Sequence, residues 1–175
     1  MDAKKLSPWN SLEIAKLAVS CLTPLLVLIL GIAINSSLRN AELRTEIYRD
    51  VGGNLNDIYA YVSFVGGWKE LTPVDILERK RKVDKAMYTY RPFFSAELFD
   101  TYEEFMAAVF KPYGGPGQDA RIRSDISTPD GDRRIHSTNI WNPAWEDRFT
   151  KERNKNDQRN AYDRFLNQLA RDLSL

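Results

Sequence analysis

The sequence is poor in the residues that build disulfides and metal centres. Cysteine occurs once, at Cys21, and histidine once, at His136, in 175 residues. A single cysteine cannot form an intrachain disulfide, and one histidine without cysteine partners cannot make a typical zinc site. The sequence therefore predicts no metal ion and no cofactor. It fits a reducing compartment without requiring one.

An excess of charge of either sign is also lacking. The chain has 25 Lys and Arg residues against 24 Asp and Glu residues, which gives a formal net charge of +1. Proteins that bind nucleic acid through its phosphates carry a clear excess of bases. We therefore expect no nucleic-acid partner.

Motifs for nucleophilic, phosphate-binding and metalloprotease chemistry are missing as well. The sequence contains no Gly-x-Ser-x-Gly, no P-loop lysine motif and no HExxH. His136 lies in a polar stretch in which Ser137, Asp130 and Asp132 are its neighbours only along the chain. A general base needs a nucleophile and an orienting acid in space. We therefore assign no catalytic residue and expect His136 at the surface.

One long apolar run is the clearest positive feature. Residues 17–34, LAVSCLTPLLVLILGIAI, carry no charge, and as a helix they extend about 27 Å, close to the hydrocarbon thickness of a bilayer. Extension back to Leu12 includes Glu13 and Lys16, which lie near enough to the end to reach the head groups. The sequence predicts an N-terminal tail over 1–11, one transmembrane helix over 12–35 and a soluble domain over 36–175.

Other interpretations of this run fit less well. A cleaved signal peptide would use two early lysines as its basic region, but Pro24 interrupts its apolar core and the apolar character continues past the cut. A lipoprotein site at Cys21 would need the main apolar run before the cysteine. A buried core helix would be amphipathic, whereas residues 25–30 are apolar on every face. Cleavage of residues 1–33 stays open.

The side of the membrane that holds the soluble domain is undecided. Three lysines precede the run, and three arginines follow it closely. The bias of Lys and Arg that sets orientation is therefore absent. The localisation predicted is a single-pass membrane protein with undecided topology.

Helical periodicity dominates the rest of the chain. Apolar residues recur every three or four positions over 43–65, 73–90 and 95–110, and again at both ends of 142–173, whose middle, residues 151–160, is almost wholly polar. Thr72-Pro73 and Ser95 are typical starts of helices, and no segment shows a convincing strand pattern. Gly52 and Gly53 leave open whether the first stripe is one helix or two. The predicted fold class is all-α, with the transmembrane helix followed by a roughly four-helix soluble bundle.

Residues 113–142 interrupt this pattern. They begin with a Gly- and Pro-rich stretch and contain the turn signal Thr128-Pro129-Asp130-Gly131. Irregular segments of this length inside a compact domain are commonly functional or disordered. We predict a long polar loop here.

The densest charge cluster lies on the helix expected after Pro73. Four consecutive bases follow Glu78 and precede Asp84, so a salt-bridged exposed face is the plain interpretation. Binding of an anionic surface such as lipid head groups is the functional one. The loop residues Arg121, Arg123, Arg133 and Arg134 form a second basic group, and its convergence with the run stays open. The candidate residues for the anionic surface are Arg79, Lys80, Arg81, Lys82, Arg121 and Arg123.

The strings TPVDILERKRKVD, YRPFFSAELFDTYEEFM and, after the glycines, DARIRSDI resemble those of uncharacterised bacterial single-pass inner-membrane proteins. The resemblance extends over residues 9–126 as a general layout. It implies a bacterial inner-membrane protein with a helical soluble domain, and it carries over no catalytic residue.

We therefore expect a membrane-anchored helical binding module, regulatory or adaptor in role. Its expected partners are the lipid bilayer, anionic lipid, and a partner protein or a second copy of the chain. Two alternatives remain open: a membrane-tethered enzyme with its site around residues 113–142, and an oligomeric effector that perturbs the bilayer. An enzyme should turn His136 or two carboxylates inward near the loop. A binding module should show a groove or an apolar patch, and an effector should need residues 17–34 for toxicity.

Overall fold

The computed structural model describes residues 11–112, 115, 118–129, 131–150 and 155–174. The predicted tail over 1–11 lies outside the described residues except for Ser11, where α1 begins. The chain divides into two compact units, residues up to Leu43 and residues from Arg44 onward. Helix α1 (Ser11–Ser63) extends through both units.

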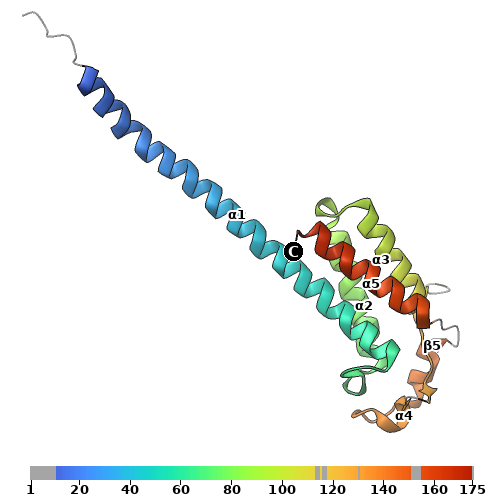
Figure 1. Cartoon of the computed structure of the whole chain (residues 1–175). Helices are drawn as coiled ribbons and strands as arrows, with labels where there is room; N and C mark the ends of the chain where they lie inside the picture. Colours follow the sequence, from blue (N-terminus) through green and yellow to red (C-terminus); the bar gives the residue numbers. More distant parts are fainter. Residues whose placement is uncertain (1–10, 113–114, 116–117, 130, 151–154, 175) are drawn as a thin grey trace, which may run out of the picture. The chain divides into compact units, whose positions relative to one another are not determined.

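The first unit is the N-terminal part of α1, drawn in blue in Figure 1. It contains an 18-residue window with a mean hydropathy of 2.1, none of which is buried in the structure. By length and composition this helix is able to cross a membrane. Thr23 Oγ1 donates a hydrogen bond of 2.7 Å to the Val19 carbonyl, one turn back. A hydroxyl satisfied in this way is compatible with apolar surroundings.

The glycine pair does not divide the remainder of α1 into two helices. Gly52 and Gly53 lie inside one uninterrupted helix that continues to Ser63. After it, Phe64 adopts a φ of 60° and Gly66 a φ of 58°, and the Val65 N–H donates to the Ala60 carbonyl at 3.0 Å. This left-handed cap ends the helix.

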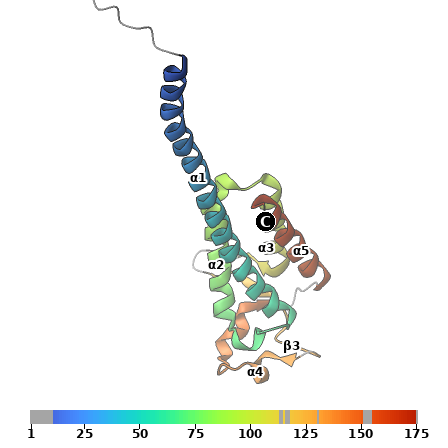
Figure 2. The same cartoon turned by 60° about the vertical axis from the view of Figure 1, so that its left-hand side comes forward.

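The second unit has its own apolar core. It is made by α1 after Leu43, α2 (Pro73–Thr89), α3 (Ala96–Val109) and α5 (Lys155–Asp172). Figures 1 and 2 both show α3 beside α5. Phe105 and Phe165 join these two helices with ring centroids 6.1 Å apart, and both rings are fully buried. Ile47, Val51, Leu55, Ile58 and Val62 supply the buried face of α1.

The predicted fold class is confirmed in its coarse form: the described chain is mostly helical, with one long apolar helix near its N-terminus. Thr72 and Ser95 are the N-caps of α2 and α3, as expected. The caps can be read from sequence because they involve residues three positions apart.

The prediction that the soluble part has no strand is wrong. Strands β1 (Phe110–Lys111), β2 (Arg121–Arg123) and β5 (Phe149–Thr150) form a small sheet, β1 antiparallel and β5 parallel to β2. Phe110, Ile122 and Phe149 lie opposite one another in its register, and all three are buried. The sheet therefore contributes one row of three buried apolar side chains to the core.

Residues 113–142, predicted as an irregular loop, contain more structure than expected. Besides β2 they include a hairpin of β3 (Ser127–Thr128) with β4 (Gly131–Asp132), followed by the short helix α4 (Arg133–His136). The helix predicted from residue 142 to the end is also corrected. Asn142 caps a 3-10 helix (Pro143–Arg148), β5 follows, and α5 begins only at Lys155.

Candidate functional site

The N-terminal cap of helix α2 determines which of its residues face the core and which, including the basic run, face outward. Thr72 Oγ1 accepts a hydrogen bond from the Asp75 N–H at 3.2 Å, and Asp75 Oδ2 accepts one from the Thr72 N–H at 2.8 Å. This capping box sets the helical register. Ile76, Leu77, Val83 and Met87 then point into the core, and the bases between them lie on the remaining faces.

Each base of the run forms an ion pair. Lys82 Nζ lies 2.8 Å from Glu78, and Lys80 Nζ lies 2.6 Å from Asp84, which are the two acids expected from the sequence. Arg79 Nε lies 3.0 Å from Asp57 on α1, and Arg81 pairs with Asp119. The list of partners is therefore Glu78, Asp84, Asp57 and Asp119.

Asp57 and Asp119 reduce the net charge of the α2 surface that carries the basic run. From the sequence, four bases faced two acids and left a surplus of two. Asp57 and Asp119 come from elsewhere in the chain and offset that surplus in space. Asp84, the partner of Lys80, is itself fixed by a hydrogen bond of 2.7 Å that it accepts from the Tyr102 hydroxyl. Burial and this hydrogen bond both raise the pKa of Tyr102.

Of the two candidate loop arginines, Arg121 lies near the run and Arg123 contacts the small sheet. Asp119 bridges Arg81 and Arg148, with Arg148 Nη1 at 2.6 Å from Asp119 Oδ2, and these guanidinium groups lower the pKa of Asp119. Arg121 lines a hollow of about 280 Å³ together with Asp119 and Arg148. Arg123 instead donates from Nε to the Phe110 carbonyl at 3.2 Å. Arg121 is thus brought near the Arg81 side of the run.

The expected second basic group does not form as a unit. Arg134 pairs with Asp132 at 2.7 Å beside α4, and this pairing lowers the pKa of Asp132 to about 2. Arg133 is 1% exposed and lies in the core. A charged side chain is buried only where its donors find partners. Arg133 is buried because residues from other segments, such as Tyr61 and Ser124, accept its hydrogen bonds.

A groove between α1 and α2 gathers part of the predicted site. Its volume is about 550 Å³, and three bases and one carboxylate line it. Its lining residues are Asp50, Asn54, Arg79, Lys82, Lys85, Ala86, Thr89 and Tyr90. Lys80 and Arg81 are absent from this lining. The run is therefore divided between two faces of α2, and only Arg79 and Lys82 face the α1–α2 groove.

The sequence reasoning missed Lys85, Thr89 and Tyr90 as members of this groove. The signal was present, because Arg79, Lys82, Lys85 and Thr89 follow one another at spacings of three, three and four residues, which places them on one helix face. Within the described part of the chain, Lys85 forms no ion pair. It is exposed, so its ammonium group is available to a ligand in the groove.

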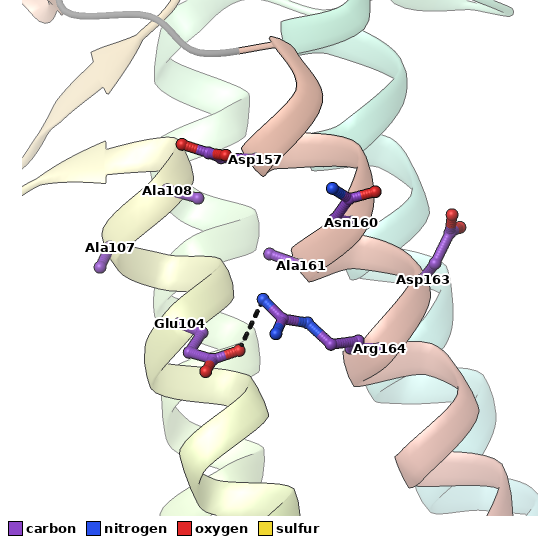
Figure 3. Close-up of a pocket in the computed structure, with 8 residues that line it drawn as sticks. All are labelled: Glu104, Ala107, Ala108, Asp157, Asn160, Ala161, Asp163 and Arg164. Carbon is purple, nitrogen blue, oxygen red and sulfur yellow. Dashed lines mark ion pairs between the residues drawn. The ribbon is translucent and has the colours of Figure 1, made fainter.

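A second groove lies between α3 and α5 and has a volume of about 790 Å³. Figure 3 shows Ala108 of α3 and Ala161 of α5 facing each other across the groove, while Ala107 lies on the outer side of α3. Small side chains let the two helices approach closely. An ion pair of 2.9 Å between Glu104 and Arg164 spans the groove. This pair occupies Arg164, the one base of the lining, whose other polar side chains are Asp157, Asn160 and Asp163. The α3–α5 groove therefore suits an anionic ligand poorly, and we do not regard it as the site.

If the protein is an enzyme with its site around residues 113–142, His136 or two carboxylates there should point inward. Among the described residues of this segment, His136 is exposed, and the charged side chain that turns inward is that of Arg133. In the described parts of the chain, no three His, Cys, Asp or Glu side chains gather closely enough to hold a metal ion. The arrangement offers cationic hydrogen-bond donors rather than acid–base or nucleophilic chemistry.

Comparisons with known proteins add no family to this description. The chain matches no protein-family model, no curated protein and no solved structure.

Proposed function

We propose that the protein is a single-pass membrane-anchored binding module, placed in a bacterial inner membrane by the resemblance noted in its sequence. The observation that carries this proposal is the unburied apolar window of α1, on a chain whose second unit has a complete core of its own. Burying a side chain such as Leu26 or Leu28 away from water contributes about 1.5–3 kcal/mol. In the structure these side chains are exposed, and a bilayer is the surrounding that would cover them on all sides.

In this proposal, α1 after Leu43, α2, α3 and α5 form a four-helix bundle that carries the α1–α2 groove. The groove binds an anionic group, with lipid head groups favoured because the anchor holds the domain near the bilayer. Lys85 and the polar groups of Asn54, Thr89 and Tyr90 supply a first set of contacts. Lys82 can join them, because its ion pair with Glu78 is half-exposed and such pairs contribute little to stability.

The anchor is tested by replacing both Leu26 and Leu28 with Arg in the full-length protein. Each arginine at the centre of the apolar helix costs about 2.5–3.5 kcal/mol on insertion, so the variant should leave the membrane fraction. A matched control replaces both residues with Ile, which keeps the apolar surface. We expect the wild type and the Ile control to resist an alkaline carbonate wash. Release of the wild type by that wash would contradict the proposal.

A further inference from the structure

The second unit has two ends, and the helices define them. Asp50 and Asn54 in the first turns of α1 after Arg44 line the same groove as Thr89 and Tyr90 at the end of α2. Helix α2 therefore runs back along α1. We call the end formed by residues 44–50 and 85–95 the Arg44 end, and the end formed by residues 63–71 and 133–140 the Ser63 end.

The Arg44 end exposes aromatic side chains. Phe93 is 62% exposed and Tyr88 is 58% exposed. Phe93 lies in a 3-10 turn (Arg91–Phe93) that Pro92 helps to fix, with the Phe93 N–H donating to the Tyr90 carbonyl at 2.9 Å. Its ring thus lies on a turn with defined backbone geometry, and most of the residue's surface is exposed.

Packing holds the neighbours of Phe93 in place. The Tyr88 ring lies edge-on to Phe99 at 5.9 Å between centroids, and the Arg91 guanidinium lies 4.5 Å from the centre of the same Phe99 ring. Phe99 itself is buried. The buried Phe99 ring therefore fixes Tyr88 and Arg91, which remain exposed at the surface. Lys85 is exposed at the same end.

Chain connectivity limits how far this end can be from the apolar helix. Residues 35–43 separate the apolar run from Arg44, and whatever their conformation they extend at most about 30 Å. The Ser63 end lies about 30 Å beyond the Arg44 end, because residues 44–63 of α1 are helical. The chain therefore limits the distance between the Arg44 end and the apolar run more tightly than the distance between the Ser63 end and that run.

We propose that the Arg44 end docks on the lipid surface, with Phe93 and Tyr88 inserted among the head groups. Aromatic side chains favour this zone of a membrane, and lysine and arginine beside them reach the phosphates. Lys85 and Arg91 are the bases of this patch, while Glu97 and Asp172 lie at the same end of the unit. The charges are near balance, so docking depends on the rings more than on anionic lipid.

This inference rests on the proposed anchoring, and the test keeps the two apart. Full-length protein with Cys21→Ser and Phe93→Cys carries an environment-sensitive fluorophore at position 93 and is reconstituted in phosphatidylcholine vesicles containing lipids with a quencher at the head group or upper acyl chain. The matched control carries the fluorophore at position 140, through Ile140→Cys. Ile140 is 95% exposed and lies at the Ser63 end, where Asn139 donates to the Glu70 carbonyl.

We expect the lipid-borne quenchers to reduce the emission at position 93 several-fold more than at position 140, and 0.5 M salt to change this ratio little. Equal quenching at the two positions in carbonate-resistant protein would overturn the docking and leave the anchor standing. A blue-shifted but unquenched probe at position 93 would show that a protein surface, such as a second copy, covers this end, which also overturns the proposal. Extraction of the protein by carbonate would overturn the anchor and the docking together.

Discussion

The guanidinium of Arg133 lies against Tyr61 in two ways at once. Its central carbon is 3.9 Å from the centre of the Tyr61 ring, and its Nη2 donates to the Tyr61 carbonyl at 2.7 Å. Phe64 lies on the same group at 3.8 Å, and Ser124 and Asp125 accept further hydrogen bonds at 2.9 and 3.1 Å. Arg133 therefore fastens the segment after β2 to the end of α1.

Arg133→Ala should destabilise the second unit severely. The substitution removes the hydrogen bonds from the guanidinium to the Tyr61 and Asp125 carbonyls and to the Ser124 hydroxyl, and each hydrogen bond to a charged group contributes about 1.5–3 kcal/mol. We expect the free energy of unfolding to fall by at least about 3 kcal/mol, measured by urea unfolding in nanodiscs with tryptophan fluorescence. Arg159→Ala is the matched control and should have a small effect, because Arg159 is exposed and its ion pair with Asp163 is long and solvated. Similar values for the two variants would show that Arg133 is not a structural support.

Phe105→Ala should be a core substitution of the usual cost. Phe105 is fully buried and contacts the rings of Tyr162 and Phe165. The cavity should lower the free energy of unfolding by about 3–5 kcal/mol, whereas Ala at the adjacent, half-buried Met106 should cost clearly less. Chemical denaturation of both variants checks this order. An unchanged midpoint for the Phe105 variant would place its ring outside the core.

Lys82→Glu combined with Lys85→Glu should weaken the binding of anionic lipid in the α1–α2 groove. The probe is short-chain phosphatidylserine below its micelle concentration, titrated into full-length protein in neutral nanodiscs. Each base contributes about 1 kcal/mol near an anionic surface, so reversing two should reduce the affinity at least about tenfold. Arg159→Glu is the control, since that residue is an exposed base on α5 outside the groove.

Inorganic phosphate in the same titration distinguishes a free anion from a lipid head group. Salt should weaken the interaction with the lipid, because exposed charges are screened within about 10 Å at 0.1 M. If the wild type binds neither probe at low salt, Arg79 and Lys82 belong to a solvated salt-bridged face.

The hairpin next to Arg133 should respond to acid. Hydrogen bonding to Arg134 is the main reason that the pKa of Asp132 falls to about 2, below the usual value of about 3.9. A lowered pKa in the folded state contributes stability above pH 4, and this contribution is lost as the pH falls from about 4 to 2. Asp132→Asn should remove that part of the pH dependence while retaining a capping side chain for α4. Parallel pH profiles of melting temperature for the two proteins would contradict the assignment.

Several features of this protein depended only on residues close together along the chain. The apolar run, the cap at Thr72, the buried stripe through Phe105 and the Lys82–Glu78 pair are of this kind. Each involves contacts within one or two turns of a helix, so the spacing of residue types was enough to predict it. The basic run was also identified from sequence, but only Arg79 and Lys82 of its four bases line the α1–α2 groove.

The remaining features depended on which distant segments meet. The row of Phe110, Ile122 and Phe149 pairs strands of two or three residues, too short for a periodicity of their own. Asp57 and Asp119 reach the basic run from another helix and a loop. Arg133, grouped from the sequence with the other loop arginines, lies among the rings of Tyr61 and Phe64. Spacing along the chain determined the helices and their caps, whereas the charge of the basic face and the burial of Arg133 were decided by tertiary packing, because a charge is neutralised or buried only by partners that folding brings to it.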